Sequence, residues 1–283
     1  MTVTLNNEFL QISFETKGAQ LVSLVKGGRE YIWQRDEKYW SECAPVLFPM
    51  VSAVLDNYFT YKDKKYPLPA HGFAQNCEFE IVNKTDSSAL LHIIKTDDIK
   101  NIYPFEFDFY VSYALNGGKL DIKYIVKNIS KTQDMYFNTG SHEGYNLFSG
   151  NTDDYYLEFE KEENLLQKVV YDPVWEGETR DFGKTNILEL KEEYFKIDGI
   201  FFTDVKSKYV TLKCKKDDAS VRVYFDCDKF GVWKAYGSSF LCMEPWDGFC
   251  PYKGDSHDIA QKRFIKVLPP EKEYEFNHSI EIL

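Results

Sequence analysis

Residues 107–126 read FDFYVSYALNGGKLDIKYIV, and this stretch decides the fold. Apolar side chains occupy every second position from Phe107 to Leu115, and the same spacing returns from Leu120 to Val126. A period of two is that of a β-strand with one buried face. The intervening Asn116-Gly117-Gly118 readily takes the backbone angles of a tight turn. The stretch therefore predicts an antiparallel hairpin.

Pairs of alternating runs about a short turn recur along the chain. They occupy 22–33 around Gly27-Gly28, 77–95 around residues 85–88, and 209–227 around Asp217-Asp218. Because hairpin-linked strands follow one another, an alternation of strands and helices is disfavoured.

Two segments depart from this pattern. Residues 37–43 are the best candidate for a short helix, and residues 151–191 form the most irregular and charged portion. Since many antiparallel strands must hide their edges by closing or stacking, we predict an all-β fold, a large antiparallel β-sandwich.

Composition supports one large core. The 283 residues are 43% apolar and 17% aromatic, and no Pro/Gly/Ser-rich linker or sustained repeat divides them. An all-β domain of this length can be single, so we predict one domain over residues 1–283.

Charge and targeting patterns narrow the partners. The 34 Lys and Arg against 45 Asp and Glu give a formal charge of −11, which repels polyanions, and only five of the cations are Arg. We therefore expect no nucleic-acid partner and favour a neutral small-molecule ligand. No secretory signal or membrane-length apolar run is visible, so we expect no membrane partner and a cytoplasmic location. The six cysteines form no C-x-x-C pair and are expected to be reduced core thiols.

The chain has five histidines, of which one stands out. His92 and His278 lie in strand-like runs and are interpreted as structural, whereas His257 lies in a polar segment as a weaker candidate. His142 follows an aromatic strand and is flanked by small residues, so it is either an ordinary loop residue or a held site residue. No histidine and cysteine spacing matches a zinc motif, and we expect neither a metal nor a cofactor.

Glu244 is an unusual carboxylate because the strand that contains it, FLCMEPW at 240–246, is otherwise apolar. Alternation places Glu244 on the same face as Cys242, with Trp246, Phe249 and Tyr252 close behind in the sequence. Buried carboxylates usually have a partner or a function. Glu244 is thus either a salt-bridged structural residue or a site residue beside aromatic rings that could stack on a sugar.

Several longer motifs complete the pattern and lie in a fixed order: GAQLVSL at 18–24, YIWQ at 31–34, APVLFP at 44–49, LPAHGF at 68–73, NTGSH at 138–142, DG at 198–199 and EPWDG at 244–248. In this order they resemble the aldose 1-epimerase (galactose mutarotase) superfamily, and in particular its LacX-like bacterial subgroup, over essentially the whole chain. The resemblance implies a galactose mutarotase-like supersandwich with an open sugar cleft.

The resemblance also implies roles for individual residues. His142 matches the general acid and Glu244 the general base, while His71 and Asp198 match binders of sugar hydroxyls. We add Trp246 and Phe73 as aromatic substrate contacts. The implied activity is interconversion of the α and β anomers of a free neutral aldose, by a monomer or a homodimer.

Two positions depart from the family pattern. Arginines that commonly face the ligand in the family are replaced by Ala53, in Ser52-Ala53, and by Gln75. Their loss favours one alternative, a non-catalytic carbohydrate-binding protein of the same fold. It counts against another, a sugar-6-phosphate 1-epimerase, because phosphate recognition relies on cationic side chains.

Overall fold

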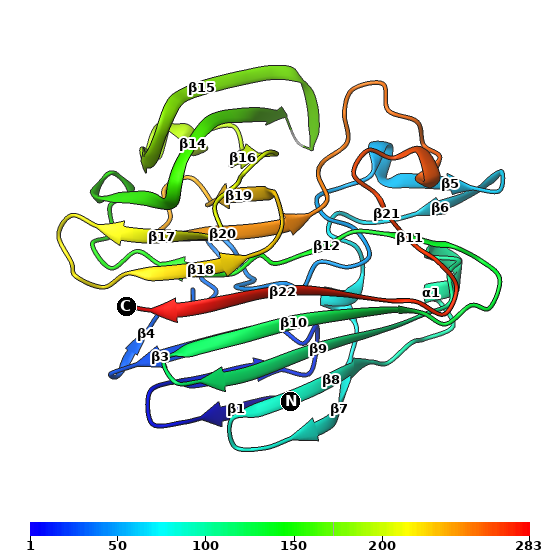
Figure 1. The fold of residues 1–283 in the computed structure, drawn as a ribbon, viewed down its shortest axis with the longest axis horizontal. Helices are drawn as coiled ribbons and strands as arrows, with labels where there is room; N and C mark the ends of the chain where they lie inside the picture. The colour runs from blue at the N-terminus through cyan, green and yellow to red at the C-terminus, as the bar shows by residue number, and fades with distance from the viewer. Residues whose placement is uncertain (172) are drawn as a thin grey trace.

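The computed structural model describes residues 1–171 and 173–283, and its strands pair antiparallel in two main sheets (Figure 1). The smaller sheet is formed by consecutive N-terminal strands, β1 (Thr2–Asn6), β2 (Gln11–Glu15), β3 (Leu21–Lys26) and β4 (Arg29–Glu30). The main path of the larger sheet runs, in spatial order, through β12 (Thr139–Gly140), β20 (Phe240–Asp247), β19 (Lys229–Trp233), β16 (Ile200–Phe202), β14 (Tyr155–Tyr171), β17 (Tyr209–Cys214), β18 (Val221–Phe225), β22 (Glu273–Ile282), β10 (Lys119–Asn128), β9 (Phe107–Asn116), β8 (Ser88–Ile93) and β7 (Phe79–Lys84).

Shorter elements complete the architecture. β13 (Gly144–Asn146) pairs with β20, and β15 (Val174–Glu189) pairs with β14. Two small ribbons join β5 (Tyr58–Tyr61) to β6 (Lys64–Pro67), and β11 (Met135–Phe137) to β21 (Lys266–Leu268). The helical elements are α1 (Ile99–Ile102) and single 3₁₀ turns at Leu55–Asn57, Ala74–Asn76, Thr152–Asp154, Glu192–Phe195 and Ile259–Gln261. None of the helices in the described part of the chain has the length and apolar character needed to cross a membrane.

The predicted hairpins are confirmed. β9 and β10 pair in the register Leu115↔Leu120, and Gly117 in the turn has a φ of 58°. β3–β4, β7–β8 and β17–β18 form the other three. Along β9 and β10 buried and half-buried residues alternate, which is the one-sided burial that the sequence period requires.

The two sheets pack face to face through the apolar side of these strands. Phe14 of β2 stacks on Tyr113 of β9 with ring centroids 5.1 Å apart, and the Tyr113 hydroxyl donates to the carbonyl oxygen of Ala19 at 2.6 Å. This contact between an inward aromatic ring and the opposite sheet confirms the predicted antiparallel sandwich.

One local prediction was wrong. Residues 37–43 form turns rather than a helix: the amides of Tyr39 and Trp40 both donate to the Asp36 carbonyl oxygen at 2.9 Å, and the chain then bends away. Residues 151–191, the most irregular and charged portion of the sequence, contain the long paired strands β14 and β15, whose pairing is interrupted by three register shifts (Figure 1). Most of β15 is exposed or half-buried on both faces, so its sequence lacks the alternation that marks a one-sided strand.

A second, smaller apolar cluster lies apart from the main core. It contains Leu47, Val51, Val170, Phe201, Trp246, Phe249 and Cys250, with Trp175 and Tyr252 packed against it. Because Phe201 and Trp246 also line a cleft, this cluster forms one wall of the candidate site.

Candidate active site

A cleft of about 320 Å³ opens over β20 and gathers residues from distant parts of the chain. It is lined by Trp40, Glu42, Pro45, Ser52, Ala70, His71, Gln75, His142, Pro173, Asp198, Phe201, Trp233, Glu244 and Trp246. Five of the six site residues predicted from the sequence are therefore brought together, and the exception is Phe73. The volume lies in the range typical of small-molecule sites.

Strand register places His142 opposite Glu244. On one side of His142, Gly140 of β12 pairs with Trp246, and on the other side Gly144 of β13 pairs with Cys242. Residues 141–143 lie outside the strands, but the Ser141 amide donates to the Pro245 carbonyl oxygen at 3.1 Å and the Met243 amide to the Glu143 carbonyl oxygen at 3.3 Å, so position 142 faces position 244. Cross-strand neighbours bring their Cβ atoms within about 4.5–5.5 Å of each other. The two side chains are held together by the sheet itself.

Glycine on the other neighbouring strand leaves room for the carboxylate. Gly231 of β19 pairs with Glu244, and a Cβ at position 231 would lie 3.4 Å from the Glu244 Cβ and 3.1 Å from the Phe201 ring. All eight residues of β20 are buried, so neighbouring residues pack against Glu244 on every side except the one that faces the cleft.

The pair is in contact but incompletely hydrogen-bonded. His142 Nε2 lies 3.3 Å from Glu244 Oε2, and the side chains are 10% and 0% exposed. Within the described residues neither Glu244 oxygen has a hydrogen-bond partner, and His142 Nδ1 also has none. Buried polar atoms left this way are costly to a fold and mark places where a ligand is expected to complete the bonding.

Burial moves both pKa values toward the uncharged forms. It raises the pKa of Glu244 well above its ordinary value, and the charges of Asp198 and Glu143 raise it further. Burial lowers the pKa of His142 well below its ordinary value, with a smaller lowering from His71. Burial therefore favours the uncharged forms of the pair, a carboxylic acid and a neutral imidazole, over an ion pair.

His71 enters the cleft from a strained loop position. Its φ is 61°, in the left-handed region, and its ring meets the His142 ring edge-on with centroids 5.3 Å apart. The Ser52 amide donates to His71 Nδ1 at 3.3 Å, which leaves the proton of the neutral ring on Nε2. Burial lowers the pKa of His71 to about 4, so the ring is a neutral hydrogen-bond donor near pH 7.

Asp198 and Trp246 lie on the walls beside the pair. The Asp198 carboxylate accepts from the Gly199 amide at 2.8 Å, which fixes it just before β16. Trp246 stacks on Phe201 with centroids 5.2 Å apart, and its Nε1 donates to the Ser141 carbonyl oxygen at 3.2 Å. A hydrogen-bond acceptor and a fixed aromatic surface thus flank the reactive centre.

Trp40 and Trp233, two residues that the sequence did not identify as site residues, lie beside His142. The His142 ring centroid lies 5.1 Å from that of Trp40 and 5.6 Å from that of Trp233, and both tryptophans line the cleft. Trp40 was concealed in the segment read as a helix. Trp233 ends β19, and only the long-range pairing of Trp233 with Cys242 of β20 brings it to the site, so no signal in the sequence marks it.

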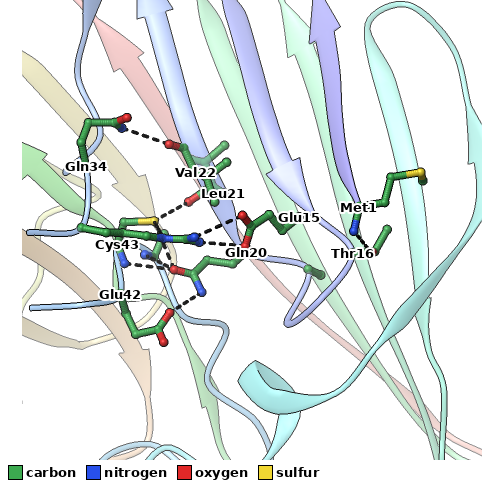
Figure 2. Close-up of polar contacts among 12 residues, drawn as sticks. Met1, Glu15, Thr16, Gln20, Leu21, Val22, Gln34, Glu42 and Cys43 are labelled. Atoms are coloured by element: carbon green, nitrogen blue, oxygen red, sulfur yellow. Dashed lines mark hydrogen bonds and ion pairs between the residues drawn. The ribbon is translucent and has the colours of Figure 1, made fainter. Parts of the chain in front are cut away.

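The loop that contains Trp40 and Glu42 is anchored by one buried amide (Figure 2). Gln20 Nε2 donates to Glu42 Oε2 at 2.8 Å, and Gln20 Oε1 accepts from the amides of Cys43 and Ala44 at 3.0 and 3.2 Å. Gln20 belongs to the motif at 18–24 and Ala44 begins the motif at 44–49, and Glu42 and Cys43 directly precede Ala44. Gln20 therefore links the smaller sheet to the cleft wall.

The structure places Phe73 and Ala53 away from the cleft lining. Phe73 packs in the main core against Phe48, Tyr103 and Phe107, with ring centroids 5.8–6.0 Å apart. Ala53 is 0% exposed and is not among the lining residues. Of the two departures from the family pattern, only Gln75 reaches the cleft, where its Nε2 donates to the Ala70 carbonyl oxygen at 3.4 Å.

The remaining histidines have partners outside the cleft. His92 contacts Glu80 and Asp108 at 3.2 and 3.1 Å, as a structural residue would. His257 contacts Asp56 at 3.0 Å on the surface. His278 Nε2 lies 2.9 Å from Glu143 Oε1 in the core, so Glu143 turns away from its neighbour His142 and contacts another histidine instead.

Comparisons with known proteins agree with one another. A family model described as aldose 1-epimerase matches residues 1–281. The chain is 30% identical over 285 residues to the plasmid-encoded protein LacX of Lactococcus lactis subsp. lactis, with 95% of each chain covered.

Solved structures extend the likeness. A galactose mutarotase related enzyme from Lactobacillus acidophilus is 28% identical with a TM-score of 0.95, covering 100% of this chain and 97% of that one. A galactose mutarotase-like protein from Lactobacillus casei is 25% identical with a TM-score of 0.92, covering both chains fully.

We predict that Ala53→Arg lowers the melting temperature, because a buried alanine has no room for a guanidinium and overpacking costs about 1–3 kcal/mol. Gln75→Arg is the matched control: this position lines the cleft, and we expect its melting temperature to stay close to wild type. Thermal unfolding of the wild type and the two variants measures the difference in melting temperature. An Ala53→Arg variant as stable as Gln75→Arg would contradict this account of position 53.

Proposed function

The chain belongs to the aldose 1-epimerase family, and we propose that it interconverts the α and β anomers of a free neutral aldose. The observation that carries the proposal is the pair of His142 and Glu244, 3.3 Å apart on the floor of the cleft. An acid and a base in contact suit this reaction, because the two oxygens involved are bonded to the same carbon.

The chemistry needs two proton transfers. Glu244 as a carboxylate takes the proton of the C1 hydroxyl, and His142 as an imidazolium gives a proton to the ring oxygen. The bond between C1 and the ring oxygen breaks and C1 becomes an aldehyde carbon. Rotation about the bond from C1 to C2 and the reverse transfers then close the ring on the other face.

The pKa shifts of Glu244 and His142 favour the protonation state that ring opening produces. Ring opening converts the charged pair into a carboxylic acid and a neutral imidazole with the same total number of protons. Burial favours that uncharged form on both residues. The same preference holds before the sugar reacts, so forming the charged pair has a cost that is recovered when the two proton transfers return both residues to their uncharged forms.

The remaining residues suit a sugar. In this proposal His71 donates from Nε2 to a sugar hydroxyl, Asp198 accepts from another, and the ring of Trp246 stacks on the sugar; the contacts that orient these three side chains support it. Phe73 acts indirectly in this account, as core packing beneath the loop of His71.

The charge of the cleft favours a neutral substrate. Glu42, Asp198 and Glu244 are acidic, and the described lining residues include no lysine or arginine. A phosphorylated sugar would meet repulsion without a cationic partner, so the sugar-6-phosphate reading is disfavoured.

The same observation favours a second candidate, a carbohydrate-binding protein of this fold that does not catalyse. Ligand-facing arginine would add charge-assisted hydrogen bonds to the substrate, and Gln75 supplies only neutral ones. Such a protein would still bind sugar in the cleft but leave the anomers to exchange at the solvent rate.

We predict that the protein accelerates anomer exchange of at least one aldose above the buffer rate. Proton NMR exchange spectroscopy over hexoses, pentoses and deoxysugars measures both exchange and binding. Saturable binding with only buffer-rate exchange across the panel would establish the binding protein instead. Phosphorylated forms of the same sugars should not bind, and their anomers should exchange only at the buffer rate.

We predict that Glu244→Gln and His142→Asn each lower the exchange rate by about 10²- to 10⁴-fold, the usual effect of losing a positioned acid or base. Both variants are expected to fold, since Gln has the shape of Glu, and Asn is a smaller polar side chain that fits within the space of His142. His92→Asn is the matched control, a histidine that also contacts carboxylates but lies outside the cleft. Folded Glu244→Gln or His142→Asn enzymes within a few-fold of wild type would refute the assigned roles.

We predict a bell-shaped pH dependence of kcat/KM, with its maximum between the lowered pKa of His142 and the raised pKa of Glu244. The active pair holds one proton. Because the pKa of Glu244 is raised, that proton is lost only as pH rises past the raised value. Because the pKa of His142 is lowered, a second proton binds only as pH falls past the lowered value. A buffer-corrected rate that keeps rising with pH would mean that an ionised carboxylate acts alone.

A further inference from the structure

A third potential ligand atom lies beside the acid–base pair. One ligand atom from each of His142, Cys242 and Glu244 lies within 4.8 Å of the other two, and all three residues are buried. Cys242 and Glu244 share a face of β20, and His142 lies across from Glu244 on the neighbouring strand segment. No sequence spacing reveals this group, because two of its members are about a hundred residues from the third.

The polar atoms of the cluster are poised for a ligand. Among the described residues both Glu244 oxygens lack a hydrogen-bond partner, and the Glu244 side chain is 0% exposed. His142 and Glu244 line the cleft, so a small ion can reach them from solvent, with Cys242 behind them.

The spacing fits a tetrahedral ion. Ligand bonds of about 2.0–2.1 Å to nitrogen and oxygen at the tetrahedral angle separate those two atoms by roughly 3.3–3.4 Å. The observed distance from His142 Nε2 to Glu244 Oε2 is 3.3 Å. The thiol sulfur needs a separation of roughly 3.5 Å from each of the others, so side-chain adjustments of about 1 Å complete the site.

We propose that His142, Cys242 and Glu244 form a zinc-binding site that opens to the cleft. Three protein ligands of nitrogen, sulfur and oxygen with a fourth position open to water are a donor set that zinc uses. A thiolate and a carboxylate together balance the charge of a divalent ion, so the bound site buries no net charge. A hard cation such as Mg²⁺ is excluded because sulfur is a poor ligand for it.

Zinc bound there inhibits anomer exchange. It occupies the Glu244 carboxylate and the His142 imidazole, and neither can then transfer a proton to or from the sugar. This consequence rests on the proposed function, whereas the metal site itself does not.

Cobalt spectroscopy tests the site without any sugar. We expect Co²⁺ added to EDTA-treated protein to bind one ion per chain, with visible absorption of tetrahedral type and a near-ultraviolet sulfur-to-cobalt band. Zn²⁺ should displace it, because zinc binds such sites more tightly. Zn²⁺ should also slow anomer exchange reversibly, and EDTA should restore the rate.

Variants identify the ligands. Cys242→Ala should abolish the sulfur-to-cobalt band and weaken metal binding by at least about 100-fold, since changes even outside the ligands cost 10- to 100-fold. Glu244→Gln removes a different ligand atom and should weaken binding similarly, which keeps the test decisive if Cys242→Ala does not fold. Cys214→Ser, at a more exposed thiol, should leave the band intact.

Two results would overturn the proposal: no sulfur-to-cobalt band in the wild type, or a band that survives Cys242→Ala. If no aldose is epimerised but the cobalt spectrum follows the expected pattern, the metal site stands and the proposed function fails. If anomer exchange is fast and Zn²⁺ leaves it unchanged, inhibition is excluded.

Discussion

The pairing register of β20 is the constraint on which the site depends. This buried strand has β19 on one side and β12 and β13 on the other, and each neighbour contributes something different at position 244. His142 supplies the reactive partner from one side, and Gly231 supplies space from the other. A slip of one residue would turn Glu244 to the face that Leu241 and Met243 now occupy, and would turn those two apolar side chains toward the cleft.

That constraint has an energetic cost. A buried carboxyl group without hydrogen-bond partners destabilises a fold by about 1–3 kcal/mol, so packing elsewhere must offset it. The apolar cluster around Trp246 and the main core on the other side hold β20 in place. The same unmet bonding capacity makes the pair reactive toward a sugar and attractive to a metal ion.

Local patterns in the sequence predicted much of the fold. Alternation about Asn116-Gly117-Gly118 identified a hairpin, and Glu244 stood out in an apolar strand. Neither pattern shows that position 142 faces position 244, because that pairing is long-range and only the family resemblance connected the two residues. The outer strand β15 was missed because both its faces are largely exposed. Trp40 was missed because a loop held by Gln20, rather than a helix, brings it to the cleft.

The central claim is that His142 and Glu244 act as one catalytic unit that holds a single proton between them. A double-mutant cycle in anomer exchange with His142→Asn, Glu244→Gln and the combined variant measures this directly. Removing either member of a unit already disables the other, so we expect the combined variant to be within a few-fold of the slower single variant. Rate losses that multiply, so that the combined variant is slower by the product of the two single effects, would show that the residues act independently and would contradict the account.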